Sequence, residues 1–182
     1  MDMAMVRRLV PEDGEALRML RLEALRLHPE AFGSSHAEES ARPVETFAEW
    51  TTRGYIAGGF VDGRLDAMAG LSVPGSAKQM HKGMLWGVYV RESRRGGGLA
   101  EAVMDAVLGH AGTQVEQVHL SVAATNVRAF RFYRRLGFEP YGVEPRALKV
   151  NGGYVDELLM VKVLDRRTGR PSPGGPQSSH AI

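Results

Sequence analysis

Three consecutive glycines, Gly96, Gly97 and Gly98, stand between an apolar run and a helical pattern. Glycine tolerates a positive φ and lets a ligand come close to the backbone, so such a loop can direct several N–H groups to one point. A helix that begins just after the loop adds N–H groups without intrahelical partners and the positive end of its dipole. These features predict a seat for a phosphate or pyrophosphate group, with a flexible surface turn as the alternative.

The segments on either side of the glycines indicate a strand before the loop and a helix after it. Met80–Val90 contains β-branched and aromatic residues typical of a buried strand. After the loop, Leu99, Val103 and Val107 recur at helical spacing. We expect this helix to end near Gly109–Gly112.

Two well-known phosphate loops do not match this segment. A Walker loop requires Gly-Lys followed by Ser or Thr, whereas Leu99 and Ala100 follow Gly98. A dinucleotide-binding fingerprint requires a third glycine, and Glu101 stands at that position. A nucleotide-phosphate enzyme built on this loop would therefore lack its lysine and its metal-binding carboxylate.

A different pattern fits better. The sequence Arg-x-x-Gly-x-Ala from Arg95 follows a strand that ends in Val-x-Val, and it resembles the acetyl-coenzyme A pyrophosphate loop of the GNAT superfamily of N-acetyltransferases. Residues 120–138 combine a strand, Asn-x-x-Ala-x-x-x-Tyr from Asn126 to Tyr133, and Leu-Gly-Phe, which is similar to the second signature of that superfamily. The two motifs occur in the expected order, and the resemblance covers about residues 4–164.

The resemblance implies the GNAT fold, an α/β (α+β) domain with a mixed, mostly antiparallel sheet of about seven strands and about four flanking helices. In that fold the sheet is splayed between the fourth and fifth strands. The residue patterns indicate strands at Ala4–Val10, Tyr55–Val61, Arg64–Val73, Met80–Val90, Val115–Val122, Phe138–Val150 and Tyr154–Leu164. They indicate helices at Glu12–His28, at Pro43–Arg53, after the glycine loop, and at Asn126–Leu136.

Three connections are predicted in more detail. Asp62-Gly63 and Asn151-Gly152 are the dipeptides of tight hairpins. Residues 28–36 form a turn-rich connection between the first two predicted helices. This helix–loop–helix, with Leu-Glu-Ala-Leu and Pro-Glu-Ala-Phe-Gly-Ser-Ser, resembles the acceptor-side region of many family members. That region folds over the substrate end of the cleft in the family.

The resemblance assigns most of the donor site to backbone groups. Those of Val88 and Val90 would bind the pantetheine amides as an added strand, and the Val88 N–H would polarise the thioester carbonyl. The N–H groups of Arg95–Ala100 would bind the pyrophosphate, with charge added by Arg94 or Arg95. The residues expected at the coenzyme are Val88, Tyr89, Val90, Arg95, Gly96, Gly97, Gly98, Leu99, Ala100, Asn126 and Tyr133. Arg91 is interpreted as solvated surface.

Two residues of the second signature have a structural and a functional interpretation. Asn126 can cap its helix, and in the family its side chain hydrogen-bonds the pantetheine arm. Tyr133 occupies the family's usual acid position near the coenzyme sulfur, where a phenol with a pKa near 10 can protonate the leaving thiolate. Packing of the Tyr133 ring on Phe130 and Leu136 is the alternative.

The general base is not fixed by the sequence. Many relatives carry a glutamate on the strand that leads into the donor site, but Met84–Val90 contains no carboxylate. The candidates are Glu23, His81, His119, Asp156 and Glu157. We favour Glu23 acting through water, although each candidate also fits a structural role.

Composition limits the other possibilities. The 182 residues, 43% hydrophobic and 24% charged, suit one domain, expected at 1–164, followed by a disordered tail at 165–182. The 23 basic against 21 acidic residues do not indicate nucleic-acid binding. The lack of cysteine excludes disulfides, thiolate metal sites and a cysteine nucleophile, and we expect no metal. No run of 18 apolar residues is present, so we expect no membrane association and a cytoplasmic protein.

The expected function is enzymatic: transfer of an acetyl group from acetyl-coenzyme A to a primary amine by direct attack in a ternary complex. The acceptor, a small molecule, an amino acid or a protein amine, is not identified by the sequence. A non-catalytic coenzyme A sensor with the same fold is the alternative. It is favoured by the missing strand carboxylate and disfavoured by Tyr133 and Asn126. Dimers are common among relatives, so a homodimer is a candidate assembly.

Overall fold

The centre of the molecule is a seven-stranded sheet with the order β1-β2-β3-β4-β5-β7-β6. The computed structural model describes residues 4–164, and the predicted tail at 165–182 lies outside them. Neighbouring strands are antiparallel except β4 and β5, which are parallel. The strands are β1 (Ala4–Arg8), β2 (Tyr55–Val61), β3 (Arg64–Ser72), β4 (Lys82–Val90), β5 (Gln117–Ala123), β6 (Glu139–Val150) and β7 (Gly153–Val163). The predicted mixed sheet is confirmed, and most element ends differ from the prediction by one or two residues.

Both predicted hairpin turns are present. Asp62 and Gly63 have φ values of 49° and 80° between β2 and β3. Asn151 and Gly152 repeat these values, 49° and 80°, between β6 and β7. Two successive left-handed residues match the right-handed twist of the flanking strands, which explains why Asp-Gly and Asn-Gly occur here.

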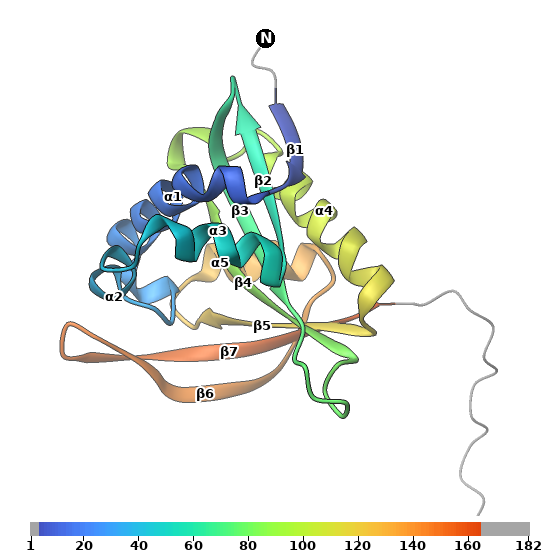
Figure 1. Cartoon of the computed structure of the whole chain (residues 1–182). Helices are drawn as coiled ribbons and strands as arrows, with labels where there is room; N and C mark the ends of the chain where they lie inside the picture. The colour runs from blue at the N-terminus through green and yellow to red at the C-terminus, as the bar shows by residue number, and fades with distance from the viewer. Residues whose placement is uncertain (1–3, 165–182) are drawn as a thin grey trace, which may run out of the picture.

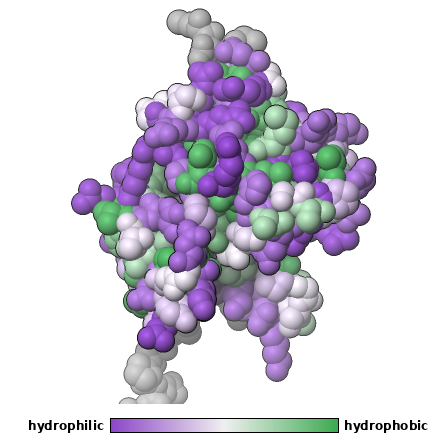
Figure 2. All heavy atoms as spheres, turned by 90° about the vertical axis from the view of Figure 1, so that its left-hand side faces the viewer, coloured by the Kyte–Doolittle hydropathy of each residue, from purple (hydrophilic) through white to green (hydrophobic). Residues whose placement is uncertain are grey.

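Helices cover both faces of the sheet (Figure 1). The α-helices are α1 (Gly14–Leu27), α2 (His36–Ser40), α3 (Val44–Arg53), α4 (Leu99–Gln114) and α5 (Val127–Arg135). One core lies between the sheet and α1 with α3, and a second lies between the sheet and α4 with α5. No helix within residues 4–164 has the length and apolar character needed to cross a membrane. Seen from the side of α2, the surface is mainly hydrophilic, with apolar patches near its middle (Figure 2).

Residues 4–164 contain five α-helices, where the sequence analysis predicts about four. The additional helix is the short α2. Ser35 caps it by accepting a hydrogen bond from the Glu38 N–H at 3.2 Å. The Glu38 carboxylate accepts from the Ser35 N–H at 3.0 Å in return. Ser-x-x-Glu is the capping-box pattern, so the sequence carried a signal for this helix that the prediction did not use.

Helix α4 is longer than its glycines suggested. It continues to Gln114, so the prediction of an end near Gly109–Gly112 is wrong. Val107 and Ala111 are fully buried against the sheet, while a Cβ on either glycine would meet nothing within 4 Å. Packing of the apolar side therefore outweighs the cost of a helical glycine, about 1 kcal/mol each.

The sheet is splayed between β4 and β5, as expected. The two strands pair only from Lys82 to Met84 on β4, so the second half of β4 has no neighbour on this side. The register of β4 with β3 also skips Gly87 and Val88, and Gly87 has a φ of 64°. A left-handed glycine at such a skip is the geometry of a β-bulge. The bulge leaves the Val88 backbone outside the regular strand ladders.

Candidate active site

A cavity of about 500 Å³ lies along the unpaired half of β4 and reaches the glycine loop and α5. We call it the glycine-loop cavity. The predicted coenzyme residues that line it are Val88–Val90, Arg95, Gly96, Ala100, Asn126 and Tyr133. Gly97 and Gly98 are not among the lining residues, and Leu99 is buried in the core. The structure therefore brings both sequence motifs to one cavity.

The glycine loop turns sharply before α4. Gly96 and Gly98 have φ values of 82° and 81°, and Gly98 is the N-cap of α4. No side chain caps this helix, so the N–H groups of its first turn remain available for a ligand. The loop and the helix dipole together form a site suited to an anion at one end of the cavity.

Three arginines line the glycine-loop cavity. Arg95 is held in place by a hydrogen bond from its Nε to the Val90 carbonyl at 3.1 Å, and its Nη2 lies 3.2 Å from His28 Nε2. Arg128 and Arg135 also line the cavity, and the sequence analysis missed both. Glu30 and Glu101 line the cavity too, and Glu101 lies 3.8 Å from Arg135, so Arg95 and Arg128 are the arginines that best suit phosphate groups.

Arg91 is not solvated surface, so that interpretation is wrong. Its side chain is only 16% exposed, and its Nη1 donates to Asp66 Oδ1 at 2.7 Å. Its Nε donates to Glu23 Oε2 at 2.9 Å. Arg94 Nε reaches Asp66 Oδ2 at 3.1 Å, so Arg94 points to this cluster and Arg95 to the cavity. These ion pairs tie α1 and β3 to the start of the glycine loop.

Asp66, the fully buried acid that pairs with Arg91 and Arg94, is stabilised in its charged form. Burial alone would raise the pKa of the Asp66 carboxyl, but hydrogen bonds from Arg64 and Arg91 hold it below its ordinary value. Glu23 also accepts a hydrogen bond from the Tyr89 hydroxyl at 3.0 Å. Burial and this bond raise the pKa of Tyr89 to about 12. Glu23 does not line the glycine-loop cavity, and its carboxylate is occupied by Arg91 and Tyr89.

Asn126 and Tyr133 each make a structural contact and also line the glycine-loop cavity, which are the two interpretations that the sequence analysis gave for them. The Asn126 side chain accepts a hydrogen bond from the Ala129 N–H at 3.1 Å, so it caps α5 while it lines the cavity. The Tyr133 ring packs on Phe132 and Phe138. Burial raises the pKa of the Tyr133 phenol above its ordinary value, so the hydroxyl remains a proton donor at neutral pH.

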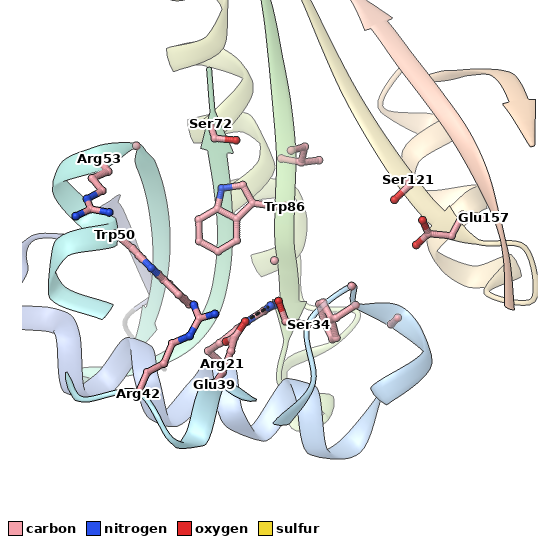
Figure 3. Close-up of a pocket in the computed structure, with 16 residues that line it drawn as sticks. Arg21, Ser34, Glu39, Arg42, Trp50, Arg53, Ser72, Trp86, Ser121 and Glu157 are labelled. Atoms are coloured by element: carbon pink, nitrogen blue, oxygen red, sulfur yellow. Dashed lines mark hydrogen bonds and ion pairs between the residues drawn. The ribbon is translucent and has the colours of Figure 1, made fainter. Parts of the chain in front are cut away.

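A second cavity, of about 490 Å³, begins where the first ends on β4. We call it the tryptophan cavity because Trp50 and Trp86 line it, with ring centroids 5.7 Å apart (Figure 3). The division on β4 falls between Gly87, in this cavity, and Val88, in the glycine-loop cavity. Phe32 lines both cavities. The bulge is therefore the place where two ligands, one in each cavity, would meet.

One wall of the tryptophan cavity is a buried ion pair. Arg21 Nε and Nη2 each donate to Glu39 at 2.9 Å, and the two side chains are 6% and 2% exposed. The Arg21 guanidinium lies 4.9 Å from the Phe32 ring centroid. This bidentate pair joins α1 to α2 and supports the segment around Phe32.

Comparison with known proteins identifies the family. The model of the acetyltransferase (GNAT) family matches residues 19–138, which include β4, the glycine loop and α5. The chain belongs to the GNAT acetyltransferase family.

Among curated GNAT relatives are the L-methionine sulfoximine/L-methionine sulfone acetyltransferases of Pseudomonas aeruginosa and Pseudomonas paraeruginosa, each 34% identical over 87 residues. That match spans 46% of this chain and about half, 49%, of either relative. The fold resembles the putative acetyltransferase yncA of Salmonella typhimurium, solved with its cofactor acetyl-CoA, at a TM-score of 0.80 and 16% identity. That match covers 94% of this chain and 99% of the other.

The ribosomal-protein-alanine N-acetyltransferase of Brucella melitensis has a similar fold, with a TM-score of 0.77 and 20% identity. The match covers 88% of this chain and 99% of that one. At such identities the solved structures support the GNAT fold alone.

The base candidates of this GNAT chain lie in different places. His81 is exposed, and Asp156 accepts a hydrogen bond from the Arg146 N–H at 2.7 Å. His119 Nδ1 lies 3.3 Å from the Tyr141 hydroxyl, and burial lowers its pKa. Only Glu157, among the five candidates, lines the tryptophan cavity, beside Ser121.

The predicted acceptor-side helix–loop–helix contributes most of the lining of the tryptophan cavity, and the base candidate Glu157 contributes to it as well. Sequence reasoning gave no role to the other side chains of this cavity one by one. Arg21 carried a usable signal, because it lies on the buried side of α1 between Leu17, Leu20 and Ala24. An arginine on an apolar stripe requires a buried partner or a ligand. Trp50 and Trp86 gave no signal that separated cavity lining from core packing.

Proposed function

We propose that this chain transfers the acetyl group of acetyl-coenzyme A to a primary amine held in the tryptophan cavity. The observation that carries the proposal is the meeting of two cavities at the Gly87–Val88 bulge, with Tyr133 in one and Glu157 in the other. A two-substrate reaction needs this arrangement, because both reactants must be held at one point.

The residues of the glycine-loop cavity fit acetyl-coenzyme A. The unpaired half of β4 offers backbone groups to the amides of a pantetheine arm, as an added strand would use them. The left-handed Gly96 and Gly98 direct N–H groups at the start of α4 to a pyrophosphate, and Arg95 adds charge. The bound coenzyme would supply the acetyl group as a thioester. The solved neighbour with acetyl-CoA supports this assignment.

One backbone group and two side chains have roles in the transfer itself. The Val88 N–H, outside the strand ladders, polarises the acetyl carbonyl. Glu157 takes a proton from the acceptor ammonium, directly or through water, so that the neutral amine can form the new C–N bond. As the C–S bond breaks, the Tyr133 hydroxyl donates its proton to the sulfur, and the second proton of the attacking nitrogen returns to the Tyr133 oxygen, directly or through water. We assign the base to Glu157 rather than Glu23, because the carboxylate of Glu23 is held by Arg91 away from both cavities.

The names of two relatives support an amine acceptor. The curated relatives are named for two amino-acid analogues, and one neighbour is named for a protein alanine. The name of the solved neighbour specifies acetylation of a nitrogen.

Thiol release is a direct test. The protein contains no cysteine, so a thiol reagent would report only free coenzyme A. Acetyl-coenzyme A and a panel of amino acids, diamines and peptides should give amine-dependent release, with an N-acetyl product by mass spectrometry. Tight coenzyme binding without release for any amine would favour a coenzyme A sensor instead.

A further inference from the structure

Three side-chain nitrogen atoms within residues 4–164 are buried without a hydrogen-bond partner: Arg18 Nε, Arg21 Nη1 and His119 Nε2. A buried donor without a partner is costly, so each such atom needs an explanation. Of these three residues, only Arg21 lines a cavity. The unpaired N–H groups of Arg21 are therefore the ones that a ligand could satisfy.

The rest of the Arg21 guanidinium is held firmly. Its Nε and Nη2 each donate to the Glu39 carboxylate at 2.9 Å (Figure 3), and the Phe32 ring centroid lies 4.9 Å away. The bidentate contact uses one edge of the planar guanidinium and leaves Nη1, with its two N–H groups, on the opposite side. The Arg21 side chain is 6% exposed, so water competes little with these contacts. Nη1 is thus fixed in place by bonds that its own N–H groups do not make.

Nη1 lies next to the bulge in β4. A Cβ placed on Gly87 would have two contacts within 4 Å apart from its chain neighbours: Met68 Cε at 3.1 Å and Arg21 Nη1 at 3.7 Å. Because glycine has no side chain, nothing of Gly87 separates the guanidinium from the bulge. The Gly87–Val88 peptide unit carries the Val88 N–H, which in the proposed function polarises the acetyl carbonyl. A backbone donor and an arginine donor therefore lie close to one peptide unit, where the two cavities meet.

We propose that Arg21 Nη1 donates a hydrogen bond to the acetyl oxygen during transfer and forms an oxyanion hole together with the Val88 N–H. The proposal rests on the proposed function, because it adds a catalytic residue to that reaction. When the amine nitrogen attacks, the C–N bond forms and the π electrons of the carbonyl move to its oxygen, which becomes an oxyanion. When the C–S bond breaks, that electron pair re-forms the C=O bond. The sulfur keeps the C–S bonding pair and takes the Tyr133 proton.

The surroundings of Arg21 suit a donor that acts on the transition state more than on the bound substrate. The oxygen carries a full negative charge only between the two bond changes, so a donor directed there lowers the barrier more than it tightens binding. The side chain cannot rotate without breaking both hydrogen bonds to Glu39, so the donor needs no rearrangement during the reaction. Glu39 also balances the charge of Arg21, so the pair has little attraction for a neutral acetyl group.

The first test requires neither an amine nor turnover. S-Carboxymethyl-coenzyme A has a carboxylate where the acetyl group would lie, and S-acetonyl-coenzyme A has a neutral ketone of similar size. Calorimetry would give the affinity of each analogue for wild type and for the double variant Arg21→Met with Glu39→Leu, which lacks both charges. The ratio of the two affinities, carboxylate over ketone, should be about tenfold larger in wild type, because a hydrogen bond to a charged group is stronger than one to a neutral group.

The second test separates turnover from binding. With an acceptor amine identified, the double variant should lower kcat by about 10²–10³-fold, the range for loss of one oxyanion-hole donor. The KM for acetyl-coenzyme A should stay within about threefold of wild type. Arg21→Lys keeps a cation for Glu39 but lacks the planar fork that serves Glu39 and the bulge together, so it should show a similar loss of kcat. Far-UV circular dichroism would confirm that both variants are folded.

Arg18→Lys is the matched control. Arg18 lies on the same helix, its Nη2 donates to the Ser40 carbonyl at 2.9 Å, and its Nε is also buried without a partner. It lines neither cavity, so Arg18→Lys should change kcat and the affinity ratio by less than about twofold. Equal losses in Arg18→Lys and Arg21→Lys would indicate a general effect on α1 and contradict a specific role for Arg21.

The outcomes separate the two proposals. If amines are acetylated and the double variant keeps either the kcat or the affinity ratio of wild type, the Arg21 assignment is wrong and the acetyltransferase assignment stands. A higher KM for the acceptor with unchanged kcat would place Nη1 on the acceptor and would also overturn the assignment. If no amine is acetylated, the proposed function is wrong, and the affinity ratio still decides whether Arg21 reaches the acetyl position. Failure of both analogues to bind would overturn both proposals.

Discussion

The glycine-loop cavity and the tryptophan cavity have similar volumes, about 500 and 490 Å³, but they are built in different ways. Most of the glycine-loop cavity comes from two continuous segments, residues 88–101 and 125–135. The tryptophan cavity takes one to three residues from each of α1, α2, α3, β3, β4, β5 and β7, together with residues 31–34. The ligand of the glycine-loop cavity would be bound largely by backbone groups, and the ligand of the tryptophan cavity by side chains.

This difference has a physical origin. Backbone groups become available when glycines, a bulge and an uncapped helix end expose them, and these devices occupy short stretches of sequence. Side chains that recognise a second ligand need only converge in space, so their positions along the chain are far apart. We expect mutations in the two cavities to differ in the same way, and the following predictions test this.

The largest expected effect is on turnover at Tyr133. Phe keeps the ring that packs on Phe132 and Phe138 but removes the hydroxyl, so Tyr133→Phe should fold normally and bind acetyl-coenzyme A nearly as well as wild type. If the phenol protonates the leaving thiolate, turnover should fall by about 10²–10⁴-fold. That corresponds to roughly 2.7–5.5 kcal/mol of barrier. Steady-state rates with a saturating amine would measure it.

A smaller loss of turnover in Tyr133→Phe would indicate a different role for the hydroxyl. A loss of about tenfold would indicate a hydrogen bond to sulfur without proton transfer, about 1.4 kcal/mol. A turnover number within about twofold of wild type, under about 0.5 kcal/mol, would leave Tyr133 as a core residue.

The same contrast explains what could be predicted from the sequence. The strand positions and both hairpin turns follow from local patterns, because each depends on residues that are close in sequence. The order of the sheet and the residues of the glycine-loop cavity were implied by the resemblance to the GNAT family. Arg91 was misjudged because its partners Glu23 and Asp66 are distant in the chain. The pairing of Arg21 with Glu39 depends on how α2 packs on α1, which no local pattern contains.

The second prediction concerns the wall of the tryptophan cavity. Arg21→Met should leave the Glu39 carboxylate buried without its partner and lower the free energy of unfolding by about 3–5 kcal/mol. Urea denaturation followed by far-UV circular dichroism would measure this loss. The double variant Arg21→Met with Glu39→Leu should recover much of the stability, because it removes both charges. A single variant as stable as wild type would show that the pair does not hold α1 and α2 together.

The third prediction concerns the glycine loop, where backbone conformation matters more than side chains. Gly98→Val places a β-branched residue at a φ of 81°, which should cost about 1–3 kcal/mol of strain or force the loop to change. Because the N–H groups would then move, we expect about tenfold or greater loss of acetyl-coenzyme A affinity by calorimetry. Gly97→Val is the matched control, since Gly97 is not in the left-handed region and a Cβ there has only an ordinary contact at 3.8 Å. Equal affinities for the two variants would contradict the backbone explanation.

The smallest effect is expected at Asn126, where capping and ligand binding can be separated. Asn126→Ala removes the acceptor for the Ala129 N–H and should destabilise the protein by about 1 kcal/mol. Asn126→Ser keeps a capping oxygen and should have nearly wild-type stability, but it removes the amide N–H groups that are free to contact a pantetheine arm in the cavity. If that contact exists, Asn126→Ser should lower acetyl-coenzyme A affinity by about 3- to 10-fold while the melting temperature hardly changes. Unchanged affinity in Asn126→Ser, with the expected loss of stability in Asn126→Ala, would make Asn126 a helix cap alone. The glycine-loop cavity would then bind its ligand almost entirely through backbone groups and arginines, a sharper contrast with the tryptophan cavity than the present structure requires.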